Sequence, residues 1–573
     1  MSDPIKHECA VALLRLRKPL DYYQAKYGNG EYGFSKMALL LEKQHNRGQD
    51  GAGIASLRLN PQPGVPAFHL EKSAAAENPL ADLLGRCSGN SSFAGELLLG
   101  HLRYATYGRN DIGACHPFVH ESTYLRRTLL LAGNFNLTNT QQIFDAYCRL
   151  GHHPASRADA YLVTKTIAHF LEKDSLLHEE GSPDWQTILR QSLQELDGAY
   201  TLCGLNGTGD AFAIRDPHAI RPGYYYCDDE IFVAASERPA IQAAFDCSTA
   251  DVKELPPGQA IVLTADNELK VIDCLEPAER RSCVFDRIYF SRPNDADIHH
   301  ERKMLGVSLA PALLDAVNHD YANTFFSYIP NSAQISFHGL LEELMTEAIP
   351  EGKAVRFGQI AIKDAKFRTF IADAASRKEL GIHVYDITYG LIHSGTDTLV
   401  VLDDSIVRGN TMRNSILPIL DRLEAKKIIV VSSAPIIKYP DCYGIDMACA
   451  GDLVAFQAAV SVLHRQNRED ILLAAGERAR QDLASGDNHN RMREIYDAIG
   501  DKELLAEITR LLRPTSLKAE LQVVYQSLEN LRRCCPNYTG DWYFTGDYPT
   551  PGGFHTVNQA LVNFLEHNND RAY

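Results

Sequence analysis

The amino-acid sequence predicts two domains in series, an α+β domain followed by an α/β domain built on a parallel sheet. Three observations lead to this prediction. Residues 9 to about 275 carry short β-rich runs split by loops and by two helical stretches, a pattern typical of a mostly antiparallel sheet. Beyond "ELPPGQAIVL" and the polar "LEPAERRS", longer helices alternate with fully apolar strands. Finally, residues 398–435 form a βαβ pattern, which indicates parallel strands.

Composition sets the broad class of the protein. The 573 residues, 45% hydrophobic and 23% charged, suffice for two or three globular domains. A net charge of −16 argues against nonspecific binding to nucleic acid or to an anionic membrane. The absence of a membrane-length apolar run and of a signal-peptide pattern favours the cytoplasm. Thirteen cysteines without regular spacing suit reduced thiols better than a disulfide framework.

In the first domain, predicted at 9–280, the clearest strands are "LLLAGNFNL" and "EIFVAAS", and the helices lie near 35 to 45 and 158 to 173. The second domain is predicted at 281–515. From there to residue 573 we expect a helical segment and then an irregular tail, rich in aromatic residues, Gly and Pro, that packs back on the body.

The βαβ unit of the second domain carries the most informative loop. "LVVL" at 399–402 is apolar throughout, as expected of a parallel strand covered on both faces, and "KIIVVSSA" supplies the next strand. Between them stands the polar loop "DDSIVRGN", followed by apolar residues at helical spacing. Because ligands of open parallel sheets bind at the carboxyl ends of strands, this loop is a candidate binding site.

The loop chemistry suits a sugar phosphate. The adjacent carboxylates of Asp403 and Asp404 match the two hydroxyls of a ribose, or a metal held between hydroxyls and protein. Small residues and glycine before a helix turn backbone N–H groups toward a phosphate. The loop lacks the Gly-Lys-Ser/Thr ending of a P-loop, and its two acids occupy the turn, which excludes a dinucleotide fingerprint. The alternative is that the two aspartates only cap the helix that follows.

The stretch "VLDDSIVRGNT" at 401–411 resembles the phosphoribosyl pyrophosphate loop of type I phosphoribosyltransferases. The resemblance places Asp403 and Asp404 on the ribose hydroxyls. It assigns the 5′-phosphate to Ser405, Val407, Arg408, Gly409 and Thr411. Asn410 stands where a threonine is usual.

Two further segments fit that resemblance. "YIPNSAQISFHG" at 328–339 resembles the pyrophosphate loop, with Ser332 joining Asp403 and Asp404 as a magnesium-site residue and Asn331 where an acid is common. "KFRTFI" at 366–371 resembles the loop that closes over the substrate, with Lys366 and Arg368 available for the diphosphate. Phosphoribosyl transfer passes through a cationic ribose centre while pyrophosphate departs. We therefore expect a metal, here Mg²⁺, fixed cations and the exclusion of water.

In the front half, "HECAVALL" places Cys9 at the start of an apolar run, which alone indicates a buried core thiol. Four other segments change that interpretation: "QHNRGQDGAGIA", "GHLRYATYG", "AGNFNLTN" and "RADAYLV". Together with Cys9 they resemble the glutamine amidotransferase domain of the N-terminal nucleophile class. The resemblance implies a four-layer αββα domain.

Hydrolysis of a carboxamide needs a nucleophile, a base, an oxyanion hole and a clamp on the substrate's charged end. An N-terminal cysteine can use its own α-amino group, with an ordinary pKa of about 8, as the base. This requires that no peptide bond precede Cys9, so residues 1–8 are predicted to be a propeptide.

The resemblance also assigns the substrate contacts. It implies that Arg103 binds the α-carboxylate of glutamine and Asp159 its α-ammonium. Asn134 and the N–H of Phe135 would form the oxyanion hole. The family has glycine where Phe135 stands, and Asn46 lengthens the usual His-Arg-Gly stretch by one residue.

Joined in this order, the two halves resemble the amidotransferases that act on phosphoribosyl pyrophosphate. The resemblance implies that ammonia from glutamine displaces pyrophosphate to give 5-phosphoribosylamine, which opens purine synthesis, in a homo-oligomer regulated by purine nucleotides. Two rivals stay open. One is a phosphoribosyltransferase that uses free ammonia or a nucleobase, and the other is a regulatory paralogue that binds the diphosphate sugar or nucleotides and signals to a partner.

Some members of that family bind an iron-sulfur cluster through four cysteines. Cys283 stands at the first of these positions, whereas Asp441, Gly540 and Tyr543 occupy the other three. Cluster ligation needs thiolates at set positions, so we expect no cluster. The alternative is another metal held by Cys283, Cys442, Cys534 and Cys535.

Overall fold

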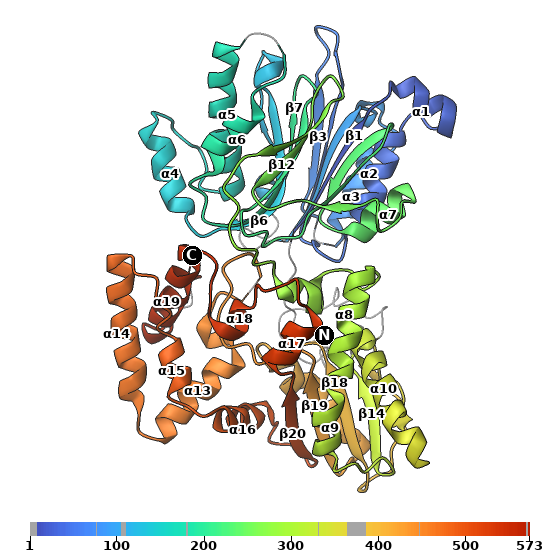
Figure 1. The fold of residues 1–573 in the computed structure, drawn as a ribbon, viewed down its shortest axis with the longest axis vertical. Coiled ribbons are helices and arrows are strands. Elements are labelled where there is room, and N and C mark those ends of the chain that lie inside the picture. The colour runs from blue at the N-terminus through green and yellow to red at the C-terminus, as the bar shows by residue number, and fades with distance from the viewer. Residues whose placement is uncertain are drawn as a thin grey trace.

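The computed structural model describes residues 9–75, 77–104, 111–178, 181–330, 332–363, 385–445, 447–568 and 571–572. These residues form two bodies, one holding the chain up to about residue 275 and the other holding the rest (Figure 1). Within the described residues, no helix combines the length and the apolar composition that crossing a bilayer requires.

Two antiparallel sheets packed face to face form the centre of the first body. In the described part of the chain the first sheet runs in the order β11 (Lys253–Glu254), β9 (Tyr224–Cys227), β10 (Ile231–Ala235), β1 (Ala10–Leu16), β4 (Leu97–Arg103), β2 (Gly51–Leu57) and β3 (Phe68–Ser73). The second runs in the order β13 (Leu269–Asp273), β12 (Gln259–Leu263), β8 (Ala211–Arg215), β7 (Gly198–Asn206), β6 (Leu129–Leu137) and β5 (Phe118–His120).

Helices cover the outer faces of both sheets, which completes the predicted αββα arrangement (Figure 1). Beside the first sheet lie α1 (Leu20–Tyr27), α2 (Tyr32–Lys43), α3 (Pro79–Cys87) and α7 (Arg238–Phe245). Beside the second lie α4 (Thr140–Arg149), α5 (Asp159–Leu177) and α6 (Trp185–Leu193). Between the sheets, alternate side chains such as Leu13, Leu99 and Ala132 form a fully buried apolar core, as the period of two in a strand requires.

The second body is built on a parallel sheet, as predicted. Its strands, counted over the described residues, run in the order β15 (Arg356–Phe357), β14 (Thr324–Tyr328), β18 (Thr398–Asp403), β19 (Lys427–Ser432) and β20 (Glu520–Tyr525). In β18, Leu399 and Val401 enter one apolar core while Val400 and Leu402 enter the other. Burial on both faces explains why this strand is apolar throughout.

Helices pack around this sheet and around one another. In the described residues they include α8 (Ala296–Val307), α9 (Ala310–Ala316), α10 (Gln334–Ala348), α12 (Leu417–Leu420), α13 (Val454–Arg465), α14 (Glu469–Ser485), α15 (Arg493–Asp497) and α16 (Asp501–Leu512). Among these, α13 packs against α14, α15 and α16. A hairpin of β16 (Ala361–Lys363) and β17 (Tyr385–Ile387) flanks residues outside the described part.

The C-terminal segment is more regular than the tail expected from its Gly and Pro content. Residues 520–525 form β20, which pairs in parallel with β19, and α17 (Leu528–Cys534), α18 (Trp542–Thr545) and α19 (Pro551–Leu565) follow. "ELQVVY" contains Glu520 and Gln522 and is mostly part-buried at the edge of its sheet, so it lacks the continuous apolar run that marks β18. Pro551 occupies the first turn of α19, where it is tolerated. The domain limits at 280 and 515 remain predictions.

Polar contacts fix the two bodies against each other. The Asp197 carboxylate, before β7, accepts hydrogen bonds from the Thr550 hydroxyl at 2.6 Å and from the Gly552 N–H at 2.9 Å. It thereby caps the N-terminus of α19 from the other domain. The amide of Asn136, in β6, donates to the carbonyl of Cys442 at 2.6 Å.

Candidate active site

Strand alternation brings three of the predicted residues to one end of the sandwich. Cys9 precedes β1, where Val11 and Leu13 face the core between the sheets. By the same alternation Arg103 continues the inward face of β4, and Asn134 that of β6. These three side chains therefore extend the inter-sheet face beyond the end of its apolar core.

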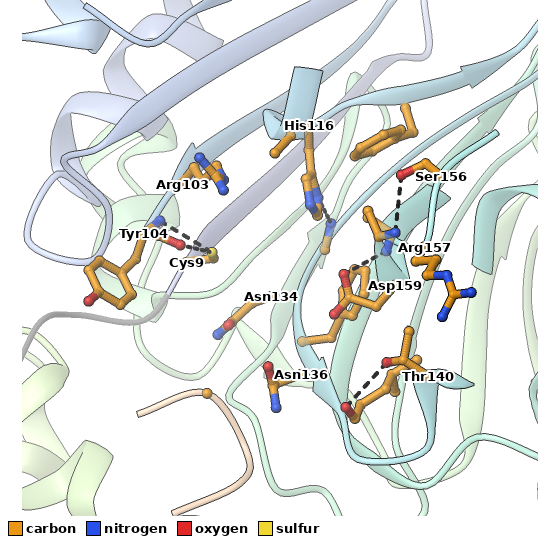
Figure 2. Close-up of a pocket in the computed structure, with 18 of the residues that line it drawn as sticks. Cys9, Arg103, Tyr104, His116, Asn134, Asn136, Thr140, Ser156, Arg157 and Asp159 are labelled. Atoms are coloured by element: carbon orange, nitrogen blue, oxygen red, sulfur yellow. Dashed lines mark hydrogen bonds between the residues drawn. The ribbon is translucent and has the colours of Figure 1, made fainter. Parts of the chain in front are cut away.

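A cavity of about 780 Å³ opens at that end and collects the residues predicted for glutamine. Its lining includes Cys9, Arg103, Asn134 and Phe135, and Asp159 from the first turn of α5. Figure 2 shows Cys9 and Arg103 on one side of the cavity and Asp159 on the other. The residues come from segments far apart in the sequence, so their convergence supports the roles predicted for them.

The Cys9 thiol is held by the backbone of Tyr104. The Tyr104 N–H donates to Sγ at 3.4 Å, and the Tyr104 carbonyl lies 3.8 Å from Sγ (Figure 2). Loss of hydration raises the pKa of Cys9 to about 11, although the Tyr104 N–H and the Arg103 guanidinium lower it. The thiol is therefore protonated at neutral pH, and a base must remove its proton before it can attack a substrate.

The backbone of β6 offers an open edge to the cavity. In β7, the Tyr200 N–H donates to the Asp216 carboxylate and the Tyr200 carbonyl accepts the Asp216 N–H, both on the side away from β6. Phe135 lies opposite Tyr200 in the sheet. Because the backbone groups of Tyr200 are directed to Asp216, this pair exchanges no hydrogen bond, and the N–H of Phe135 points to the edge of β6 that faces away from β7. There the paired part of β5 ends at Phe118, opposite Leu131. The Phe135 N–H thus points away from β7, at a residue that lines the cavity.

The phenyl ring at position 135 is accommodated because it lies on the opposite face of β6 from Asn134. It packs with the apolar cluster that includes Leu162 of α5, and its centroid is 5.6 Å from the ring of His116. The side chain therefore fills the outer layer and one wall of the cavity, which leaves the backbone edge open.

Asp159 is a poorly hydrated carboxylate at the N-terminus of α5. Burial raises its pKa to about 6, although the Ala160 N–H, at 2.7 Å, and Arg103 lower it. A carboxylate in this state gains from a cationic partner, because the partner replaces the hydration that burial removes. An α-ammonium group is such a partner.

Asn46, which the resemblance gives as an extra residue, lies in a turn after α2. Its amide donates to the Phe290 carbonyl at 3.0 Å. The next residue, Arg47, is fully buried and pairs with Glu237 at 2.6 Å and with Asp286, in the segment leading to the second domain, at 2.8 Å. The insertion therefore contributes to the contact between the domains.

Sequence patterns missed several residues that line the same cavity: His116, Asn136, Ser156, Arg157, Gly444 and Arg571. Gly444 and Arg571 belong to the second body, so both bodies enclose the cavity. The only local sequence pattern at His116 is "CHPF". It does not indicate a role by itself, because that role depends on β6, which lies beside His116 only in the fold.

The second predicted site lies at the carboxyl end of β18. Asp403 and Asp404 are buried, and the Ser405 hydroxyl donates to Asp404 Oδ1 at 3.0 Å. The side chain of Ser332, from the loop after the neighbouring strand β14, also hydrogen-bonds to Asp404. Burial raises the pKa of Asp404, while the bonds from Ser332 and Ser405 lower it. The three residues predicted for magnesium are thus brought together.

The loop that follows makes a tight turn. Gly409 has a φ of 75°, and a Cβ there would lie 2.3 Å from Cδ2 of Leu512, so both conformation and space require glycine. Arg408 pairs with Asp452 at 3.3 Å. The Val407 side chain is buried and its carbonyl accepts the Val454 N–H at 2.9 Å. Only the backbone N–H of Val407 is therefore available to a phosphate. Thr411, half-buried, precedes the helical turn that begins at Met412.

Four predictions fall on residues outside the described part of the chain. They are the propeptide at 1–8, Asn331 of the pyrophosphate loop, and Lys366 and Arg368 of the closing loop.

Among the described residues, the cysteines considered for a metal form no group of three with metal-like spacing. Cys283 Sγ lies 3.2 Å from the Tyr543 hydroxyl, and Cys442, Cys534 and Cys535 are buried in the same large core. The only trio of His, Cys, Asp or Glu with metal-like spacing in the described residues is Asp482, Asp487 and His489. Asp482 already pairs with Arg491 at 2.6 Å, which disfavours a cation there.

Comparison with known proteins agrees with this arrangement. Residues 113–243 match a family model described as a glutamine amidotransferase domain. The amidophosphoribosyltransferase of Pseudomonas aeruginosa is 26% identical over 470 residues, covering 80% of this chain and 84% of that protein. The Haemophilus influenzae enzyme of the same name is 28% identical, covering 73% of this chain and 80% of its own length. The human one is 25% identical, covering 73% and 78%.

Solved structures share the fold. The glutamine phosphoribosylpyrophosphate amidotransferase of B. subtilis, complexed with ADP and GMP, matches with a TM-score of 0.64 at 22% identity. The alignment covers 95% of this chain and 97% of that one. A structure described as the allosteric regulatory enzyme of purine biosynthesis matches with a TM-score of 0.66, also at 22% identity, covering 95% and 96%. Both domains and their order are therefore common to these proteins.

Proposed function

We propose that this chain, a homologue of the amidophosphoribosyltransferases, converts phosphoribosyl pyrophosphate, glutamine and water to 5-phosphoribosylamine, glutamate and pyrophosphate. This reaction would open purine synthesis. The observation that carries the proposal is the cavity that gathers Cys9, Arg103, Asn134 and Asp159, on a chain whose second domain holds Asp403 and Asp404 at a strand end. A cavity that gathers these four residues favours this reaction over one that uses only free ammonia.

In the first half-reaction Cys9 attacks the carboxamide carbon of glutamine. The guanidinium of Arg103 holds the α-carboxylate and Asp159 the α-ammonium, so the side-chain amide points toward the thiol. Negative charge develops on the carbonyl oxygen, where the Asn134 amide and the Phe135 N–H stabilise it. Ammonia leaves, and water hydrolyses the resulting thioester to release glutamate.

The base in this scheme is the α-amino group of Cys9, which exists only after the bond between Glu8 and Cys9 is cut. We therefore expect intact-mass spectrometry of the purified protein to show the loss of residues 1–8. A chain that keeps Met1 and still releases glutamate at full rate would contradict this base assignment. Such a result would not contradict the assignment of Cys9 as the nucleophile.

Glutamine binding is expected to depend on pH through Asp159. The carboxylate binds the α-ammonium, so KM for glutamine should rise as pH falls below about 6, the raised pKa of this group. Replacing Asp159→Asn should raise KM roughly 10- to 100-fold at pH 7.5, since a charged hydrogen bond is lost, and abolish that pH dependence. Initial rates of glutamate release from pH 5 to 8 measure both effects.

The exposed residue Asp145 of α4 provides the matched control, because Asp145→Asn removes the same charge away from the cavity. A KM for Asp159→Asn equal to that of this control would refute the role of Asp159.

In the second half-reaction ammonia displaces pyrophosphate from C1 of the ribose. Asp403 and Asp404 would hold the ribose hydroxyls, and the loop from Ser405 to Thr411 the 5′-phosphate. The oxygen donors Asp403, Asp404 and Ser332 fit Mg²⁺, which would neutralise charge on the pyrophosphate when bound. Lys366 and Arg368 are the proposed cations for the diphosphate.

Three further properties belong to the proposal. Ammonia would pass between the two sites inside the protein, since both domains enclose the glutamine cavity. The B. subtilis structure complexed with ADP and GMP supports purine nucleotides as effectors of this chain too. We also propose a homo-oligomer in the cytoplasm.

A further inference from the structure

The peptide groups of Gly133, one residue before Asn134, are held by two imidazole rings. His101 Nε2, from β4 of the other sheet, lies 3.1 Å from the Gly133 carbonyl oxygen. The Gly133 N–H donates to Nδ1 of His116 at 3.3 Å. Both histidines are buried, with exposures of 0% and 9%, and their rings stack with centroids 4.0 Å apart and planes 12° apart.

The partners fix where the protons lie. A carbonyl oxygen only accepts, so His101 must carry its proton on Nε2. A backbone N–H only donates, so Nδ1 of His116 is unprotonated and its proton lies on Nε2. Burial is the largest cause that lowers the pKa of His101, to about 3, and it also lowers that of His116. Both rings are therefore neutral across the range in which the enzyme would work.

His116 occupies the place where the β5 ladder stops. The last pair of β5 and β6 is Phe118 with Leu131, and Pro117 before it has no N–H to continue the ladder. The N–H of Gly133 is next on that edge, and the His116 ring accepts it in place of a strand backbone. The N–H of Phe135 follows two residues later on the same edge, and this is the proposed oxyanion donor.

The position is tightly constrained. A Cβ on residue 133 would lie 2.6 Å from Cδ2 of Leu202 and 2.8 Å from the Thr201 carbonyl. Residue 133 therefore cannot carry a side chain of its own to orient the edge. The orientation must come from the neighbouring side chains that reach its backbone.

We propose that His101 and His116 are positioning residues for the glutaminase reaction: together they clamp the Gly133 peptide and so aim Asn134 and the Phe135 N–H at the developing oxyanion. This inference rests on the proposed glutaminase function. The clamp ties the two sheets together at the end where the nucleophile of one sheet meets the oxyanion hole of the other. Its effect should lie in kcat, because oxyanion contacts strengthen in the transition state.

The test compares variants that keep or remove one hydrogen bond. Asn places an amide oxygen near the position of Nδ1, so His116→Asn can still accept from Gly133, whereas His116→Leu cannot. Gln reaches the position of Nε2, so His101→Gln can still donate, whereas His101→Leu cannot. We expect each leucine variant to lose about 10- to 100-fold in glutaminase kcat with KM for glutamine within about threefold, as a small misplacement would give. The amide variants should stay within about fivefold of wild type.

Two controls separate positioning from folding. His153→Leu makes the same replacement at an exposed site in the same domain and should leave kcat unchanged. Ammonia-dependent synthesis of phosphoribosylamine should be normal in every variant. The double variant with both leucines should lose less than the product of the single losses, because both rings hold one peptide.

Wild-type protein without glutaminase activity would refute the proposed function itself. Active wild type with unchanged kcat in the leucine variants would overturn only the inference. Equal losses in the leucine and amide variants would also overturn it, since a merely structural role does not depend on one hydrogen bond.

Discussion

Replacing Cys9→Ala should abolish glutamine-dependent synthesis of phosphoribosylamine, with a loss of at least about 10⁴-fold in kcat, because the thiol that forms the thioester is removed. Synthesis from ammonium salts should continue at the wild-type rate, since the phosphoribosyl site lies in the other domain. Coupled measurement of glutamate and pyrophosphate release separates the two outcomes. An electrophilic glutamine analogue should label the wild-type protein once per chain and leave the variant unmodified.

Cys148, half-buried in α4 and away from the cavity, provides the matched control. Cys148→Ala should retain both activities and the single label. Glutamate release by Cys9→Ala at a rate near that of this control would contradict the nucleophile assignment. Loss of both activities would instead show that the substitution unfolds the chain, and circular dichroism would detect it.

Replacing Asp403→Asn should lower phosphoribosyl transfer with either nitrogen source by roughly 10- to 100-fold in kcat/KM, because a charged partner of the ribose hydroxyls is lost. The glutaminase reaction measured without phosphoribosyl pyrophosphate should stay intact. Ammonia-dependent release of pyrophosphate measures the effect free of the glutamine site. Asp404→Asn should give a similar loss, and magnesium titration of both variants should show a weaker requirement.

Asp315 in α9, whose side chain is 85% exposed, provides the control in the same domain. Asp315→Asn removes one carboxylate without touching the loop. If Asp403→Asn and Asp404→Asn both matched this control, the two aspartates would be helix caps and the phosphate site would lie elsewhere. Loss of glutamine hydrolysis alone would be equally incompatible with the assignment.

The sequence predicted the elements whose local pattern matches their surroundings. β18 is apolar because helices cover both of its faces. β6 was visible because it begins with an apolar run, as a strand buried on both faces requires, and α5 because its apolar residues recur at helical spacing. β20 was missed because its place depends on β19, nearly a hundred residues earlier. A short edge strand in a segment rich in Gly and Pro carries no sufficient signal of its own.

The residues of the candidate site also fall into two groups, those that stand in a local sequence pattern and those that do not. Cys9, Arg103, Asn134 and Asp159 were predicted because they stand in recognisable motifs, and the fold brings them to one cavity. His116 was missed because it acts through the Gly133 backbone, and its role depends on where β5 ends. No spacing in the sequence encodes that contact.

The cap of α19 by Asp197 limits how this chain can be divided. The carboxylate that satisfies the first turn of the last long helix belongs to the other domain. Cutting the gene between the domains would leave a helix end without its acceptor and would remove the Thr550 and Gly552 donors of the carboxylate. We expect the two halves to unfold in one cooperative transition. Replacing either half with a domain from another protein should fail, so the chain is inherited as one unit rather than as two interchangeable modules.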